Sequence, residues 1–265
     1  KPDFYRCSLS SRDRRHRQAD RIRRRTGKQI ISITNGKYKT KSNALVVKEH
    51  SKFISFSPGN FHKRCDELAL IDNDLLFVIQ TYGYPPMWMR PNTFETLVHI
   101  ILEQQVSLAS ALAALNKLRE KIKEISAKSV LSLTDEELRS CYFSRQKTSY
   151  VRSLAEAVIN GNIDLASIEN LSDDEVRATL NKLKGIGNWT IDVYLIFVLQ
   201  RADVFPIGDL AAVNALKQLK KLPANSTREE LMKIAANWQP YRTVATMLLW
   251  HYYLSLRAKK QRIKV

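Results

Sequence analysis

The stretch Leu183-Lys184-Gly185-Ile186-Gly187-Asn188-Trp189-Thr190 lies between two segments with helical sequence patterns, residues 173–183 and 190–200. Two glycines that flank one aliphatic residue let the backbone turn tightly without a Cβ clash. They also let amide N–H groups at the start of the second helix approach a phosphate, where the helix dipole favours an anion. The turn is equally compatible with a plain corner between two helices. As a phosphate-binding hairpin, it would consist of Leu183, Gly185, Ile186, Gly187, Asn188 and Thr190, with Ile186 anchored in the core.

Helical patterns continue on both sides of this hairpin, from about residue 64 to residue 257. An amphipathic run over Asp66–Thr81 is stopped by Gly83 and two prolines, and we expect Asn92 to cap the helix that follows. Helical periodicity also covers residues 108–123, 145–160, 210–220 and 241–257. Three Ser/Thr-x-x-Glu signatures predict further helix starts, at Thr134, Ser172 and Thr227. The sequence therefore predicts an all-α body of about nine or ten helices.

Positive charge is concentrated at the two ends of the chain. Residues 1–64 hold 18 Lys and Arg against 4 Asp and Glu, and residues 257–265 hold five basic residues and no acidic one. Residues 65–256 hold 20 basic and 22 acidic residues, so the net charge of +17 lies outside them. An arginine-rich arm at residues 1–28 either binds phosphates without sequence preference or is a tail with no specific task.

We predict three parts along the chain. Residues 1–62 form a basic N-terminal extension that is partly disordered or contains short β-strands, since β-favouring runs lie between residues 29 and 56. Residues 63–256 form the helical domain, and residues 257–265 form a basic C-terminal tail. No apolar run is long enough to span a membrane. Three scattered cysteines without a CxxC pair exclude a disulfide framework and a zinc or iron–sulfur site, so no metal site is predicted: Cys7, Cys65 and Cys141.

Asp209 is the strongest candidate for chemistry. It follows the run Asp203-Val204-Phe205-Pro206-Ile207-Gly208 and opens a helix with apolar residues along one face. A plain N-cap would explain an aspartate at this position. A helix N-terminus also favours an ionised carboxylate, which stabilises the positive charge that develops on a sugar when an N-glycosidic bond breaks. The same carboxylate can orient or deprotonate the attacking water.

Four sequence blocks resemble, in the same order, the helix–hairpin–helix (HhH-GPD) DNA glycosylase superfamily, and within it the 3-methyladenine DNA glycosylase II branch. They are Ile101-Leu102-Glu103-Gln104-Gln105-Val106-Ser107, the hairpin stretch 183–190, the stretch 203–210, and Trp238-Gln239-Pro240-Tyr241-Arg242-Thr243-Val244-Ala245 with the later Trp250. A fifth, looser block is Phe143-Ser144-Arg145-Gln146-Lys147. The resemblance covers about residues 66–255. It implies two helical subdomains with the active-site cleft between them.

The resemblance implies roles for the residues of these blocks. Asp209 is the catalytic carboxylate, and the hairpin amides at Gly185 and Gly187 hold a DNA phosphate. Family members that also cut the strand carry a lysine at the position of Trp189, and a tryptophan cannot act as an amine nucleophile. The cysteine cluster of the iron–sulfur members is absent as well. Both differences imply hydrolysis without β-lyase activity. Asp192 and Asp203 lie near the same site and are expected to be helix caps or ion-pair partners.

Two further roles concern the damaged base, which must leave the duplex before its glycosidic bond can be attacked. Gln105, with Gln104 beside it, lies where the family places an intercalating wedge; a helix-surface amide is the alternative. Trp189 and Trp250 match aromatic positions of the family, and Tyr253 lies one turn after Trp250. Electron-rich ring faces attract a cationic alkylated base. The alternative for these rings is core packing.

The sequence thus predicts a monofunctional DNA glycosylase of base excision repair that removes alkylated bases of the 3-methyladenine and 7-methylguanine type. A glycosylase for deaminated or oxidised bases and a non-catalytic helix–hairpin–helix DNA-binding protein are the alternatives. The expected partner is double-stranded DNA with damaged bases, bound by a monomer without a membrane. No cofactor is expected, apart from a monovalent cation that would bridge hairpin carbonyls and a DNA phosphate. The expected location is the cytoplasm with its nucleoid in a bacterium, or the nucleus in a eukaryote.

Overall fold

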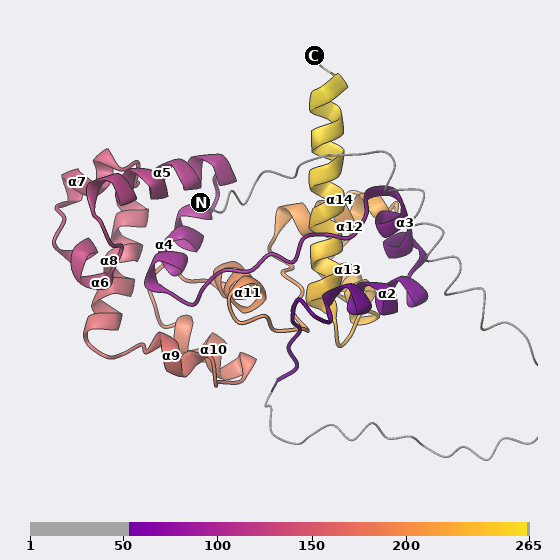
Figure 1. The fold of residues 1–265 in the computed structure, drawn as a ribbon, viewed down its shortest axis with the longest axis horizontal. Helices are drawn as coiled ribbons and strands as arrows, with labels where there is room; N and C mark the ends of the chain where they lie inside the picture. The colour runs from indigo at the N-terminus through magenta and orange to yellow at the C-terminus, as the bar shows by residue number, and fades with distance from the viewer. Residues whose placement is uncertain (1–52, 264–265) are drawn as a thin grey trace, which may run out of the picture. The chain divides into compact units, whose positions relative to one another are not determined.

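The computed structural model describes residues 53–263, and this part of the chain is built from helices (Figure 1). The only β-type pairing among these residues is an isolated antiparallel bridge between Ser55 and Arg201. The helices are α2 (Phe61–Ile71), α3 (Asn73–Tyr82), α4 (Phe94–Glu103), α5 (Leu108–Lys121), α6 (Ala127–Leu131), α7 (Asp135–Ser140), α8 (Arg145–Ile159), α9 (Leu165–Ile168), α10 (Asp173–Leu180), α11 (Asn188–Phe197), α12 (Leu210–Leu219), α13 (Arg228–Ala236) and α14 (Arg242–Ile263). The all-α expectation is confirmed for residues 53–263, and none of their helices is long and apolar enough to cross a membrane.

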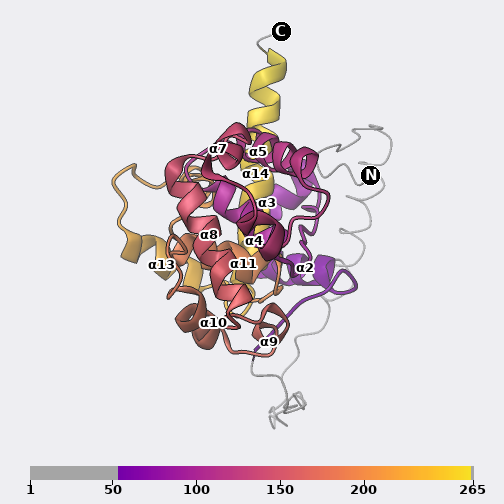
Figure 2. The same ribbon diagram turned by 90° about the vertical axis from the view of Figure 1, so that its left-hand side faces the viewer.

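Two groups of helices pack among themselves. In the first, α14 contacts α2, α3 and α12. In the second, α8 contacts α4, α6 and α7, and α4 also contacts α5. Each group buries the apolar stripes of its amphipathic helices; in α4, for example, Leu97, Val98 and Ile101 are fully buried. Figure 1 shows helices α4–α8 gathered at the left, and Figure 2 shows the last turns of α14 extending past the other helices.

Helix α11 lies in the centre of the core. Every residue from Thr190 to Ile196 is buried, so the helix is enclosed on all sides. It contacts α4 of the second group and α10, which precedes it in the chain. Because α11 is fixed in this way, the hairpin at its N-terminus and Trp189 in its first turn are held by a rigid element.

The three predicted capping boxes are confirmed. Thr134, Ser172 and Thr227 each accept a hydrogen bond from the backbone N–H of the glutamate three residues later, and that glutamate bonds back to the backbone of the cap. The remaining helices predicted between residues 108 and 257 are also present.

Three expectations differ from the structure. The run Asp66–Thr81 is two helices, α2 and α3, because the Asp72 carboxylate caps α3 and interrupts the helical backbone. Helix α4 is capped by Thr93, whereas the side chain of Asn92 donates to the Leu165 carbonyl oxygen (2.6 Å). Residues 257–263 continue helix α14 where we expected a separate tail, since neither Gly nor Pro interrupts them. The basic arm and the β-favouring runs before residue 53 lie outside the described residues.

Candidate functional site

The side chain of Asp209 lies at the N-terminus of α12 and is half-buried. Its Oδ1 accepts a hydrogen bond from the backbone N–H of Ala212 (2.8 Å), so the expected N-cap is present. Two indoles bond the same carboxylate: Trp250 Nε1 donates to Oδ1 (3.0 Å) and Trp189 Nε1 donates to Oδ2 (2.9 Å). The structure therefore brings together three predicted site residues from α11, α12 and α14.

The hydrogen bonds at Asp209 leave one acceptor position open. A carboxylate offers about four acceptor sites, two on each oxygen. Among the described residues, Oδ1 accepts two bonds and Oδ2 accepts one. The free position is therefore on Oδ2, beside the Trp189 indole. A residue that only caps a helix needs no hydrogen bond from an indole, so the two tryptophan bonds to Asp209 are not explained by helix capping.

The aromatic rings around Asp209 form a wider cluster. Phe197 stacks on Trp250 with ring centroids 5.2 Å apart, and Trp88 meets Trp250 edge to face at 6.3 Å. Trp250 is thus largely buried, whereas Trp189 is half-buried. Gly208 lies against Trp189, because a Cβ added at this glycine would meet the Trp189 Cβ at 3.6 Å.

A buried ion pair supports this cluster from behind. The Arg90 guanidinium bonds both carboxylate oxygens of the buried Glu103 (2.7 and 2.9 Å) and lies 5.1 Å from the centroid of the Phe197 ring. The Arg90 backbone N–H also donates to the Phe197 carbonyl oxygen (2.8 Å). The sequence did not point to Phe197 as part of the site, and it missed the contribution of Trp88 and Arg90. An Arg and a Trp beside prolines were the only local signal for them.

Within residues 53–263, Tyr253, the third predicted pocket residue, forms no hydrogen bond with Asp209 or with the two indoles. It is half-buried on the turn of α14 after Trp250, and its hydroxyl accepts a hydrogen bond from Arg257 Nη1 (3.2 Å). The structure therefore brings Trp189 and Trp250 to Asp209 and shows no such bond for Tyr253.

The hairpin before α11 has the expected shape. Ile186 is buried and its N–H donates to the Leu183 carbonyl oxygen (3.2 Å), which closes the turn. Gly185 has a positive φ of 83°, and a Cβ at this residue would overlap the ring of Tyr150 on α8. Gly187 is the N-cap of α11 and provides no side-chain cap. The first-turn N–H groups of α11, at Asn188 to Thr190, therefore have no helical partner and can bind an anion.

The two predicted wedge residues have different surroundings. Gln104 is tied to the hairpin, because its Nε2 donates to the Gly185 carbonyl oxygen (2.8 Å) and to the Thr190 hydroxyl (2.9 Å). Gln105 is exposed, with a positive φ of 57°, at the tip of the turn between α4 and α5. Lys147 on α8 donates to the Leu102 carbonyl oxygen just before this turn, and burial lowers the pKa of its ammonium. Gln104 thus links the wedge turn to the hairpin, and of the two glutamines only Gln105 is exposed.

The two other carboxylates near the site are ion-pair partners, as expected. Asp192 bonds Arg177 (2.6 Å). Burial raises the pKa of Asp192, and Arg177 opposes that rise. Asp203 forms a bidentate ion pair with Arg242 at the start of α14 (2.7 and 2.9 Å). Among residues 53–263, no group of His, Cys, Asp and Glu side chains is arranged to hold a metal ion.

Known proteins resemble this chain in sequence and in fold. The family model described as "HhH-GPD superfamily base excision DNA repair protein" matches residues 98–240. The chain is 31% identical over 204 residues to the alkylbase DNA glycosidase-like protein mag2 of Schizosaccharomyces pombe, which covers 73% of this chain and 95% of that protein. It is 33% identical over 169 residues to DNA-3-methyladenine glycosylase 1 of the same yeast, over 61% of this chain and 72% of the relative. The solved structure of the S. pombe 3-methyladenine DNA glycosylase Mag1 with abasic DNA superposes with a TM-score of 0.65 at 30% identity, covering 71% of this chain and 95% of that one.

Proposed function

Because the chain belongs to the HhH-GPD superfamily of base excision DNA repair proteins, we propose that it is a monofunctional DNA glycosylase for alkylated bases. Such an enzyme flips the damaged nucleotide out of the duplex and hydrolyses its N-glycosidic bond, which leaves an abasic site. Of the relatives named above, one is called alkylbase DNA glycosidase-like and the other is a 3-methyladenine glycosylase, and Mag1 was solved with abasic DNA, the product of this reaction.

The hydrogen bonding of Asp209 is the observation that carries the proposal. Three N–H donors fix the carboxylate and leave one acceptor position on Oδ2. As the glycosidic bond lengthens, positive charge builds on the sugar, and a fixed anion stabilises that transition state more than the ground state. The same oxygen can accept a proton from the water that attacks C1′. We therefore assign both the electrostatic and the general-base role to Asp209.

We propose that the base pocket uses the exposed side of Trp189. An alkylated purine is cationic, so it is attracted to an indole face and is already a good leaving group. Trp250 is covered by Phe197 on one face, so its main role is to bond Asp209 and to back the pocket. This division would explain why one carboxylate suffices, without a second one that acts as a general acid.

Strand cleavage is not part of the proposed reaction. A β-lyase needs an amine nucleophile to form a Schiff base with the sugar, and the residue that bonds Asp209 Oδ2 is an indole. Borohydride treatment during the reaction should therefore trap no covalent protein–DNA adduct. A trapped adduct would show that the lyase assignment is wrong.

We propose that the hairpin amides hold a backbone phosphate while Gln105 fills the space left by the flipped nucleotide. The bond from Gln104 to the Gly185 carbonyl ties these two actions together. No cofactor is proposed. A monovalent cation at the hairpin would share the Gly185 carbonyl oxygen with Gln104, whose hydrogen bond takes one of the two acceptor positions of that oxygen. Excision that is equal in sodium, potassium and tetramethylammonium salts would argue against such a cation.

A panel of duplexes with single lesions tests the substrate class. The panel contains 3-methyladenine, 7-methylguanine, uracil, hypoxanthine and 8-oxoguanine, each in the same sequence. We expect release of the two alkylated purines in single-turnover assays and much slower release of the neutral bases. A preference for a neutral oxidised or deaminated base would reject the cationic pocket while leaving the glycosylase assignment intact. Release of none of them would reject both.

A further inference from the structure

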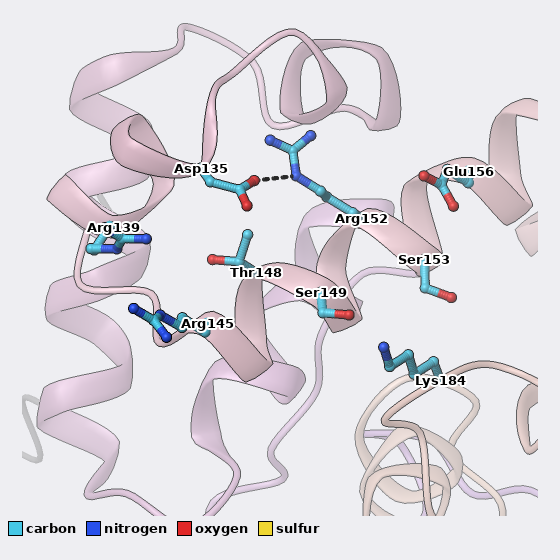
Figure 3. A pocket seen from close by; sticks show the side chains of 9 residues that line it. All are labelled: Asp135, Arg139, Arg145, Thr148, Ser149, Arg152, Ser153, Glu156 and Lys184. Atoms are coloured by element: carbon cyan, nitrogen blue, oxygen red, sulfur yellow. Dashed lines mark hydrogen bonds and ion pairs between the residues drawn. The ribbon is translucent and has the colours of Figure 1, made fainter.

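A second positively charged site lies beside the hairpin. It is an open cleft of about 590 Å³ between α8, α7 and the hairpin residue Lys184, and we call it the α8 cleft (Figure 3). Its wall on α8 includes Arg145, Ser149, Arg152 and Glu156, which recur at helical spacing on one face. Lys147, on another face of the same helix, points to α4 and is not part of the lining.

The cations of the α8 cleft are mostly unpaired. Arg152 is used internally: its Nε bonds Asp135 Oδ1 (2.9 Å) and its Nη2 bonds the Leu133 carbonyl oxygen (2.6 Å). Arg139, Arg145 and Lys184 are exposed, and none of their side chains has a hydrogen bond or ion pair with the described residues. Glu156 is the one lining carboxylate outside the Arg152 pair. The cleft is thus locally positive within residues 65–256, which are close to neutral overall.

The chemistry of the lining fits phosphate groups. Arginine and lysine bind phosphate oxygens, and serine hydroxyls add hydrogen bonds without charge. Ser149 and Ser153 provide such hydroxyls between the cations (Figure 3). The lining has few apolar side chains that could enclose a base or a small organic molecule. A sugar–phosphate backbone suits it better than a free nucleotide.

The α8 cleft is continuous with the hairpin. Lys184 belongs to both, and the next residue, Gly185, lies directly against the Tyr150 ring on α8. The hairpin and the cleft wall are therefore one rigid surface. A DNA strand whose phosphate is held by the hairpin amides can continue along this surface toward the unpaired cations.

We propose that the α8 cleft binds phosphates of the DNA backbone next to the phosphate held by the hairpin, through Arg139 and Arg145. This inference rests on the proposed function, because it takes DNA as the partner. It assigns to the near-neutral helical body a local electrostatic contribution to affinity, separate from the hairpin amides and from the basic arm.

Salt titration of binding to undamaged duplex DNA tests the cleft without using excision. Each phosphate contact contributes about 0.9 to the slope of log affinity against log salt concentration. We expect the slope of the full-length double variant Arg139→Gln/Arg145→Gln to be lower than that of the wild type by about 1.8. Raising the salt from 50 to 200 mM should therefore weaken DNA binding by the variant about tenfold less than it weakens binding by the wild type. The matched control is Arg228→Gln/Lys233→Gln, two exposed cations on α13 outside the cleft, and it should keep the wild-type slope.

Equal slopes for the double variant, the control and the wild type would overturn the proposal. An equal decrease in both variants would also overturn it, since the effect would then be one of net charge. A thermal unfolding midpoint equal to that of the wild type verifies that both variants are folded. Because the DNA carries no lesion, this result does not depend on whether Asp209 is catalytic. If the wild-type protein releases no base but the double variant has a lower salt slope, the glycosylase proposal is rejected and the phosphate site in the α8 cleft is retained.

Discussion

Gly185 is required for two independent reasons. Its φ of 83° lies in the left-handed region that side chains with a Cβ rarely adopt, and a Cβ would overlap the ring of Tyr150. Gly187, two residues later, has extended backbone and open space around its Cα. The sequence predicted that both glycines matter for the turn. The structure separates them, because only Gly185 is needed by the fold of the free protein.

The two glycines can be tested as a matched pair. We expect Gly185→Ala to lower the free energy of unfolding by roughly 2 kcal/mol or more, from backbone strain and overpacking together. Gly187→Ala should lower it by less, about 1 kcal/mol at most, because alanine is a poorer N-cap than glycine. Its methyl group would still stand between the backbone and a phosphate, so we expect weaker DNA binding by a stable protein. Urea unfolding and DNA titration of both variants measure this. A Gly185→Ala protein as stable as wild type would contradict the assigned packing.

Among the elements, the break between α2 and α3 depends on Asp72. The carboxylate caps α3 and also accepts hydrogen bonds from Lys220 Nζ at the end of α12 (2.6 Å) and from Trp238 Nε1 after α13 (2.8 Å). Burial alone would raise the pKa of Asp72, but the bonds from Lys220 and Trp238 and the charge of Lys220 outweigh burial, so the pKa is lowered. One side chain therefore connects the start of α3 with the ends of α12 and α13.

This lowered pKa predicts how stability depends on pH. The unfolded chain takes up a proton at Asp72 at higher pH than the folded chain does, so the carboxylate stabilises the fold above about pH 3.9, the ordinary pKa of an aspartate. We expect Asp72→Asn to cost about 2–4 kcal/mol at pH 7. The difference from wild type should shrink as the pH falls below about 4, toward the lower pKa of Asp72 in the folded chain. Urea unfolding at several pH values measures it.

Asp74 provides the control for Asp72. Its carboxylate also pairs with Lys220 Nζ (2.9 Å) but is half-exposed. Its side chain neither accepts a hydrogen bond from Trp238 nor caps α3. Asp74→Asn should therefore cost less than about 1 kcal/mol. Equal losses in the two variants, or a loss in Asp72→Asn that does not change with pH, would contradict the account.

Local signals explain which elements the sequence could predict. A capping box is complete within four residues, so Thr134, Ser172 and Thr227 could be identified directly. The role of Asp72 depends on Lys220 and Trp238, which are far away in the chain. Because the apolar periodicity continues on both sides of Asp72, the sequence did not indicate the break between α2 and α3. The same holds within the site. Asp209, Trp189 and Trp250 came from motif positions, whereas Trp88 and Arg90 reach the cluster only through tertiary packing.

At the scale of the whole molecule, charge is divided between the ends and the body. Residues 65–256 hold 20 basic and 22 acidic residues, so the helical body must bind DNA through amide dipoles and a few well-placed cations. We propose that the arginine-rich arm at residues 1–28 is a separate source of attraction to DNA. The two contributions should respond differently to mutation.

Neutralising the arm tests this division. We expect Gln substitutions at Arg23, Arg24 and Arg25 to lower the salt dependence of binding to undamaged DNA, by up to about 0.9 in slope for each lost contact. The rate of base release at saturating enzyme should stay the same, because Asp209 and the hairpin are untouched. Salt titration and single-turnover excision, run side by side, measure both. An unchanged slope would mean that the arm takes no part in binding.

The most direct test of the central claim is single-turnover base release by Asp209→Asn from a duplex with one alkylated purine. The substitution keeps the size of the side chain and the cap acceptor but removes the anion. We expect the rate to fall by about 10²-fold or more while binding to abasic DNA is retained. Asp174→Asn, an exposed carboxylate on α10, is the control and should release the base at the wild-type rate. Equal rates for wild type and Asp209→Asn would contradict the account.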